Sequence, residues 1–216
     1  MKLIRQFIII LAIFIFSFSF GWAEQAKGIL YFIEGGTGAG ICHVYTGRQL
    51  LKLHYTKYKE YGFEHQEGYK YGSIWNVKYH TEAGGRKVID SIEFTGKYDP
   101  AVKAADEMVR SYYIKAARGE FTEAYKMLSP GWQKDQSFDS YNRGMKKIKF
   151  KESAESAPTF ALKIIGHNSG EVLLLVNTFW FYEGASGYLK MEVKKVNGVW
   201  TIDRVTPVSF KQWDES

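Results

Sequence analysis

Four histidines in the first 80 residues are the first candidates for chemistry in this sequence. They are His43, His54, His65 and His80. A metal site needs such side chains to converge with fixed geometry, and no pair shows the i, i+4 spacing of a helical site. We therefore expect structural or surface histidines, with no metal and no cofactor.

The glycine-rich segment 35–40 has the composition of a phosphate-binding loop. Such a loop needs a helix after it and usually a lysine. The run that follows, Ile41 to Tyr45, is β-branched and aromatic, which is typical of a strand. The pattern therefore favours a flexible hairpin loop over a phosphate site.

Eight aromatic residues lie among four lysines between positions 55 and 79. On the face of a small β-barrel, such rings could stack on a glycan or contact a peptide. The candidates for this surface are Tyr55, Tyr58, Tyr61, Tyr69 and Tyr71. The favoured interpretation is that half of the rings in this stretch form the core of the barrel and the rest pack on the second half of the chain.

A second charged feature places five cations in nine residues: Arg143, Lys146, Lys147, Lys149 and Lys151. Such a run could touch anionic lipid head groups or cell-wall polymers. Cations also suit the C-terminus of a helix. A solvated helix end is therefore the favoured interpretation.

The first 23 residues have the three parts of a secretory signal. Lys2 and Arg5 precede an apolar block from Phe7 to Phe20, and small residues lie at −3 and −1 of a cut after Ala23. The block is short for a membrane span, which needs ~20 residues, and an uncleaved anchor is the alternative. We expect an exported protein, periplasmic or extracellular, that does not span the membrane after cleavage.

Removal of that segment takes the formal charge from +6 to +4. This charge is mild and bears on solubility, so it predicts no nucleic-acid partner. The single cysteine, Cys42, excludes an intrachain disulfide framework. A buried thiol is favoured there over an intermolecular disulfide.

The mature chain divides by composition into 24–98, with 12 glycines and no proline, and 99–216, with all four prolines. Short strands are expected at 28–34, 41–45, 50–55, 73–80 and 88–95. Five short strands without a helical period fit a small all-β barrel, SH3-like or OB-like. The expected boundaries are 1–23 for the signal, 24–98 for the barrel and 99–216 for the second domain.

Helices open the second half, and strands close it. Asp99 and Pro100 can begin a first helix that ends at Gly119, Thr122 a second through Leu128, and Ser137 a third. Strands are expected at 159–165, 172–182, 189–194 and 199–208, with a hairpin at Asn197-Gly198. Helices followed by an antiparallel sheet indicate an α+β fold.

This second half also resembles a known superfamily. The runs Val109 to Tyr113, Arg118 to Phe121 and Gly198 to Asp203, with Ala124-Tyr125, Leu128-Ser129 and Trp132, resemble exported members of the nuclear-transport-factor-like superfamily. The likeness covers roughly residues 99–210. It implies a cone of three helices on a curved antiparallel sheet, with an internal cavity. That fold serves both enzymes and non-catalytic binding or assembly domains, so it does not choose a function.

The ketosteroid isomerases of that superfamily suggest a catalytic test. By the resemblance, Tyr112 falls at their oxyanion-binding tyrosine, and Asp135 is the nearest acid to their general base. A base needs a desolvated carboxylate within reach of the proton, and no acid falls convincingly at that position. The histidine–aspartate arrangement of scytalone dehydratase is not visible either, because His167 is the single histidine of this half and sits beside a turn.

A ligand pocket in the cone is a hypothesis built on Tyr112, Asn177, Trp180 and Arg204. Asn177 interrupts an apolar strand, and buried polar groups need partners. Trp180 has the wrong parity to share the face of Asn177. Such a pocket would take a small hydrophobic ligand.

The sequence as a whole favours an exported two-domain protein with a non-enzymatic binding or assembly role in the cell envelope or medium. An envelope protein is the expected partner, and a homodimer through the sheet is a further possibility. The first alternative is a small-molecule isomerase or dehydratase that uses the cone cavity. The second is glycan or peptide binding on the aromatic face of the barrel.

Overall fold

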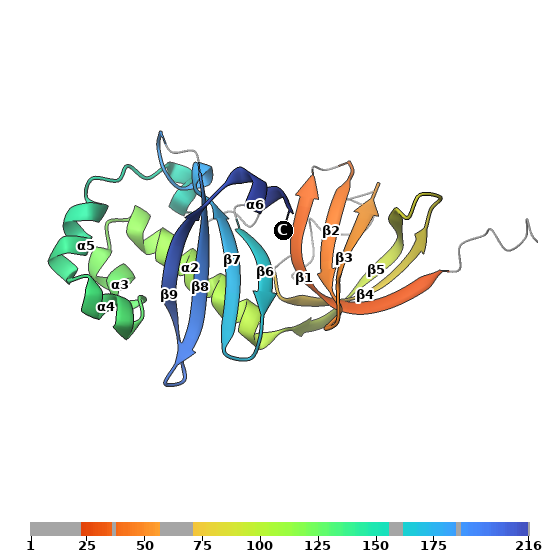
Figure 1. Cartoon of the computed structure of the whole chain (residues 1–216), viewed down its shortest axis with the longest axis horizontal. Coiled ribbons are helices and arrows are strands. Elements are labelled where there is room, and N and C mark those ends of the chain that lie inside the picture. The colour runs from red at the N-terminus through yellow and green to blue at the C-terminus, as the bar shows by residue number, and fades with distance from the viewer. Residues whose placement is uncertain (1–22, 36–37, 57–70, 156–161, 185–186, 216) are drawn as a thin grey trace, which may run out of the picture.

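The structure is a computed structural model, and it describes residues 23–35, 38–56, 71–155, 162–184 and 187–215. It is a mixed α+β fold with two sheets, as the order of elements in the sequence predicts. Figure 1 shows the five N-terminal strands beside a second sheet that carries helices.

The first sheet is a closed barrel in the order β1-β2-β3-β5-β4. Its strands are β1 (Glu24–Gly35), β2 (Gly40–Tyr45), β3 (Leu50–Tyr55), β4 (Ser73–Thr81) and β5 (Lys87–Tyr98). Alternate residues of β4 point inward, so Trp75, Val77 and Tyr79 are buried between exposed neighbours. Gly40 is required for the approach of β2 to β1, because a Cβ there would lie 2.0 Å from the Glu34 carbonyl oxygen.

Five helices are described after the barrel. They are α2 (Pro100–Ala117), α3 (Phe121–Lys126), α4 (Pro130–Asp135), α5 (Phe138–Met145) and α6 (Phe210–Glu215). Asp99 begins α2, since its carboxylate accepts hydrogen bonds from the backbone N–H groups of Ala101 and Val102. Pro100 at the first position of α2 lacks the N–H that a helix start leaves unpaired.

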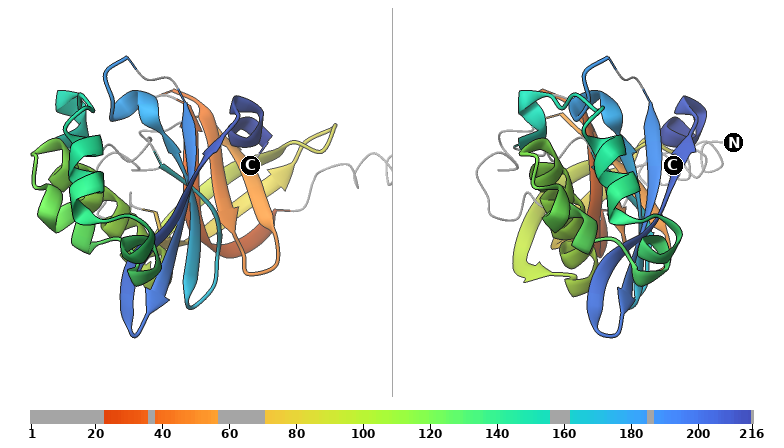
Figure 2. Two further views of the ribbon diagram at one scale, coloured as in Figure 1. Left: turned by 60° about the vertical axis from the view of Figure 1, so that its left-hand side comes forward. Right: turned by 90° about the vertical axis from the view of Figure 1, so that its left-hand side faces the viewer.

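The second sheet is antiparallel, in the order β6-β7-β8-β9. It contains β6 (Leu162–His167), β7 (Glu171–Asn177), β8 (Tyr188–Val196) and β9 (Val199–Val208), with short 3-10 turns η1 (Glu152–Glu155) and η3 (Thr178–Trp180) beside it. Helices α2 to α5 lie on one face of this sheet, and α6 lies on the opposite side (Figure 2). Asn197 and Gly198 form the hairpin turn with positive φ angles of 51° and 85°, as expected for this pair.

The two sheets share a hydrophobic core. The buried apolar side chains of the barrel, of α2 and of the second sheet form one cluster, and β1 packs beside β6. The junction is therefore part of the core.

One predicted strand is too long, and one helix was not predicted. The strand expected over 172–182 ends at Asn177, because the Asn177 side chain accepts the Phe179 N–H at 3.1 Å and starts η3. Helix α4 was not expected from the sequence: Ser129 caps its start, where the Ser129 hydroxyl accepts the Trp132 N–H at 3.2 Å.

Candidate functional site

A surface cleft of about 400 Å³ lies between α4 and β9. Its walls are Gly131, Trp132, Asp135 and Gln136 on one side, and Asp203, Arg204 and Val205 on the other. Asp135 and Arg204 are both exposed. The cleft therefore brings together two residues that the sequence suggested for different reasons, Asp135 as a base and Arg204 as a pocket residue.

Backbone hydrogen bonds attach the start of α4 to the edge of the sheet. β9 is the edge strand, and its Ile202 N–H donates to the Met127 carbonyl at 2.9 Å. The Ser129 N–H donates to the Ile202 carbonyl at 2.8 Å, and Leu128 forms a parallel bridge to Ile202. This contact covers β9 at Ile202, and the strand then continues into the cleft.

Side-chain hydrogen bonds hold Trp132, which lines one side of the cleft. The Trp132 indole N–H donates to the Gln136 side-chain oxygen at 2.9 Å. The Tyr125 hydroxyl donates to the Gln136 carbonyl at 2.6 Å, and the Gln133 amide donates to the Leu128 carbonyl at 2.8 Å. The ring is thus positioned before any ligand arrives, which lowers the entropy cost of binding.

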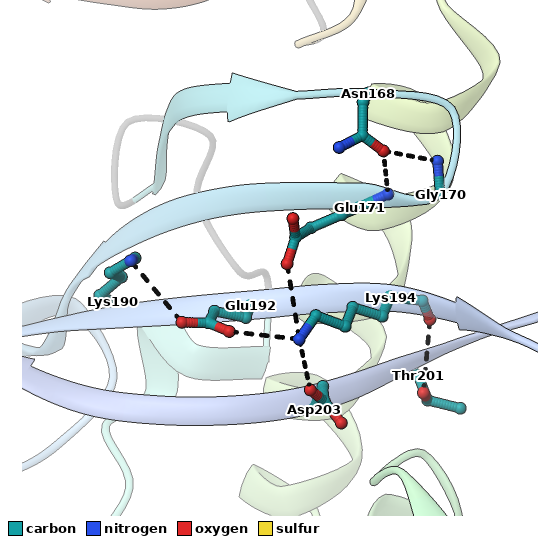
Figure 3. Close-up of polar contacts among 8 residues, drawn as sticks. All are labelled: Asn168, Gly170, Glu171, Lys190, Glu192, Lys194, Thr201 and Asp203. Atoms are coloured by element: carbon teal, nitrogen blue, oxygen red, sulfur yellow. Dashed lines mark hydrogen bonds and ion pairs between the residues drawn. The ribbon is translucent and has the colours of Figure 1, made fainter.

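Lys194 holds Asp203, the second acid of the cleft. Figure 3 shows its ammonium among three carboxylates: Asp203 at 2.8 Å, and Glu171 and Glu192 at 3.5 Å each. The hydrogen bond from Lys194 lowers the pKa of Asp203. Asp135 is therefore the acid of this cleft that is available to a ligand.

A register shift in β9 sets the direction of Arg204. Glu192 of β8 lies opposite Arg204, and the next residue, Val193, lies opposite Ile202, so Asp203 is an extra residue in β9. Bulges of this kind redirect the side chains beside them. The cleft thus presents a guanidinium, a carboxylate, an indole and the backbone of an edge strand, a combination suited to a polar, extended ligand.

Tyr112 lies in a packed cluster of rings away from this cleft. The Tyr141 hydroxyl donates to the Tyr112 hydroxyl at 3.3 Å, and the two rings of Tyr113 and Phe181 stack with centroids 3.9 Å apart. Burial raises the pKa values of Tyr112 and Tyr113. These tyrosines are neutral and serve as packing groups.

The four residues expected to line a ligand pocket have different surroundings. Tyr112 is buried against Tyr141, and Arg204 lines the outer cleft. Asn177 caps η3, and Trp180 lies in that turn, where its carbonyl accepts the Ser153 hydroxyl at 2.8 Å. A ligand pocket formed by all four residues stays a prediction, whereas the cleft that Arg204 lines is part of the described structure.

The tyrosines proposed as a binding surface on the barrel are in part core residues. Tyr55 and Tyr71 are 1% and 2% exposed, so the prediction is wrong for these two. Tyr58, Tyr61 and Tyr69 lie outside the described residues. The inward face of a closed barrel must be filled by side chains, and large rings do so efficiently.

Two polar clusters at the junction of barrel and sheet were missed by sequence reasoning. Lys163 of β6 and His43 of β2, each 1% exposed, flank the Glu34 carboxylate at 3.5 and 3.1 Å. Nearby, Tyr31 hydrogen-bonds His167, whose other ring nitrogen lies 3.5 Å from Asp99. His43 was considered only as a possible metal ligand, and Lys163 gave no signal, because a polar residue in a strand is usually expected on the solvent face.

The remaining candidates are a metal site, the thiol of Cys42 and a membrane-spanning helix. Within the described ranges, no group of three or more His, Cys, Asp or Glu side chains could hold a metal ion. Cys42 is buried, and burial raises the pKa of its thiol. In the same part of the chain, no helix has both the length and the apolar character needed to cross a membrane.

Comparison with known proteins adds little to this geometry. No protein-family model matches the chain, and no curated protein matches it. The solution structure of a SEC-C motif containing protein from Rhodopseudomonas palustris matches with a TM-score of 0.36 and 18% identity, over 49% of this chain and 80% of that one.

A second solved structure is described as an Ntf2-like protein involved in plasmid conjugation. It matches with a TM-score of 0.33 and 11% identity, over 86% of this chain and 78% of that one. At TM-scores this low, neither match assigns a function to the chain.

Proposed function

We propose that the protein is exported and has a non-enzymatic binding or assembly role. Its ligand would be an extended peptide segment of another envelope or extracellular protein, bound in the cleft between α4 and β9. The observation that carries this proposal is the cleft itself, in which edge-strand backbone lies next to Trp132, Asp135 and Arg204.

Backbone, ring and charges each have a role in such binding. The backbone of an edge strand can pair with an added strand, which supplies affinity without regard to sequence. Arg204 suits a carboxylate of the peptide, and Asp135 suits a cation. Pro207 lacks an N–H and so limits pairing to the part of β9 before it.

The position of Tyr112 supports binding over catalysis. Its hydroxyl is bonded to Tyr141, and the side chain is 9% exposed. Asp135, the acid named as a possible base, lines the outer cleft and is exposed. A general base must reach the proton that it removes and gains strength from a desolvated site, and an exposed Asp135 has no such site.

Export is supported by where the barrel begins. The signal pattern places the cut after Ala23, and β1 starts at Glu24. The Glu24 carboxylate accepts hydrogen bonds from Tyr79 at 2.9 Å and Thr81 at 3.1 Å. The proposed mature chain would therefore retain its first strand whole.

Finer assignments belong to the same proposal. We infer that residues 24–98 form an SH3-like or OB-like domain, supported by the closed order of its five strands. Residues 99–216 would form the nuclear-transport-factor-like cone, supported by the helices on one face of the second sheet.

A selection from a displayed library of linear peptides on mature protein tests the binding site. We expect selected peptides to bind the wild type, and Arg204→Glu to weaken binding by about tenfold or more, as loss of a charge-assisted pair does. Lys97→Glu, the same charge change at an exposed barrel position, is the matched control and should bind normally. Equal affinity of the wild type and Arg204→Glu for the selected peptides, or no selected peptide, would contradict the proposal.

A further inference from the structure

Two segments that are distant in sequence lie side by side at the end of the second sheet. The Lys151 N–H donates to the Phe181 carbonyl at 3.0 Å, and the Glu183 N–H donates to the Lys149 carbonyl at 2.8 Å. Phe150 and Tyr182 form a bridge between the same segments. In Figure 1 the chain from α5 to η1 crosses toward the end of β7. The end of the basic run, from Lys149 to Lys151, therefore lies next to η3.

This location concentrates the positive charge of the mature chain. Segments 143–152 and 177–183 contain five cations and two acids, Glu152 and Glu183. Their net charge is +3, out of +4 for the chain without its first 23 residues. Arg143, Lys146, Lys147 and Lys149 are exposed. Cations that serve only solubility are expected to be spread over the surface, and here most of the net charge lies in two adjoining segments.

Exposed apolar side chains accompany these cations. Phe179 is 49% exposed and Ile148 is 37% exposed. The Lys151 ammonium lies 3.6 Å from the centre of the Phe179 ring, and the Trp180 ring meets that ring edge-on at 5.3 Å. We call this surface the basic–aromatic patch: the five cations of residues 143–151 together with Ile148, Phe179 and Trp180.

The turn that presents Phe179 is firmly anchored. The Asn177 side chain accepts the Phe179 N–H at 3.1 Å, and Thr178 hydrogen-bonds the Gly187 carbonyl at 2.8 Å through its hydroxyl and at 2.9 Å through its N–H. Because β7 ends here, Phe179 leaves the pattern of alternating strand residues and points outward. A large ring held in water costs free energy, so a partner that covers it gains affinity.

We propose that the basic–aromatic patch docks on an anionic phospholipid bilayer. Lysines near such a surface are attracted by its negative potential, and aromatic side chains settle at the level of the head groups. The exposed Phe179 and Ile148 favour a bilayer over a soluble anionic polymer, because a polymer offers no apolar layer to receive them. The proposal concerns a different surface from the peptide cleft and does not depend on it.

Co-sedimentation with vesicles tests this docking on the mature chain. We expect binding to vesicles of phosphatidylcholine mixed with phosphatidylglycerol, little binding to phosphatidylcholine alone, and loss of binding at high salt. Each basic residue near an anionic surface contributes about a fivefold effect. Lys146→Glu, Lys147→Glu and Lys149→Glu together should weaken binding roughly a hundredfold or more.

A matched triple variant controls for net charge. Arg48→Glu, Lys78→Glu and Lys97→Glu make the same charge change at exposed barrel positions, and should reduce binding far less. All variants are compared only if their circular dichroism and melting temperatures match the wild type. Equal losses in the two triple variants would overturn the proposal, because the attraction would then follow overall charge.

Contact of the rings with lipid is tested separately. Brominated lipids should quench part of the tryptophan emission, and Trp180→Phe should remove that part. Phe179→Ser should weaken vesicle binding but leave binding to soluble polyphosphate unchanged. No quenching that depends on Trp180, or equal binding of the wild type and Phe179→Ser to anionic vesicles, would overturn the proposal that the patch docks on a bilayer.

Discussion

Phe179 and Phe181 have opposite environments although only one residue separates them. Phe181 is 0% exposed and stacks on Tyr113, whereas Phe179 is 49% exposed beside Lys151. The difference follows from the end of β7 at Asn177, after which η3 turns the chain. The course of the local backbone, and not the type of residue, decides which of the two phenylalanines is buried.

This pair provides a stability prediction. Phe181→Ala should lower the free energy of unfolding by about 3–5 kcal/mol, since it opens a cavity in a packed core. Phe179→Ala should cost less than about 1 kcal/mol, because the ring is half exposed. Urea denaturation of both variants measures the difference, and similar losses would contradict the assigned burial.

His43 is the buried polar residue with the clearest effect of pH. Burial lowers its pKa from 6.5 to about 4, and the neighbouring Lys163 and Lys52 act in the same direction, whereas Glu34 opposes them. The folded protein thus binds fewer protons than the unfolded chain between these pH values. The contribution of His43 to stability is complete above pH 6.5 and is lost as the pH falls toward 4.

A pH series tests this linkage. A shift of this size corresponds to roughly 3 kcal/mol between neutral and acid conditions. In His43→Leu, the free energy of unfolding should fall by that much less between pH 7.5 and pH 4, because the titrating group is gone. An identical pH dependence in the wild type and His43→Leu, measured by urea denaturation, would refute the role of His43.

At the scale of elements, the sequence predicted the features that neighbouring residues determine and missed those that depend on distant contacts. The alternation in β4, the Asp99-Pro100 start of α2 and the Asn197-Gly198 turn are each set by neighbouring residues. Helix α4 depends on distant partners, since Ser129 pairs with Ile202 of β9. Single-sequence patterns contain no information about such a contact.

Asp99 joins two elements and so gives a prediction at this scale. Its carboxylate caps α2 and lies 3.5 Å from the His167 ring. Asp99→Ala should cost about 1–2 kcal/mol of stability through loss of the cap. Asp99→Asn keeps a capping oxygen and should cost clearly less. Thermal or urea denaturation compares the two, and equal losses would show that the cap is not the source.

At the scale of the molecule, the junction of barrel and sheet is built from long-range contacts. Glu34 lies on the barrel, Lys163 lies on the second sheet, and the hydrophobic cluster runs through both. The candidate cleft is equally non-local, since α4 and β9 are about 70 residues apart in sequence. Arg204 and Asp135 were recognised singly, but their pairing follows only from the fold.

The proposed signal segment gives a prediction for the whole protein. Cleavage after Ala23 should leave a chain that begins at Glu24 and keeps β1 complete. Expression of the full chain in a secreting host, followed by intact-mass spectrometry of the exported fraction, measures this terminus. A chain that retains residues 1–23, or a cut inside β1, would contradict the signal assignment.

The central claim is that the cleft between α4 and β9 binds an extended peptide. Amide hydrogen exchange, read by nuclear magnetic resonance with and without a selected peptide, tests it most directly. The account predicts slower exchange in β9 from Arg204 to Thr206 and in α4 around Trp132. Protection confined to the barrel, with no change in β9 or α4, would contradict it.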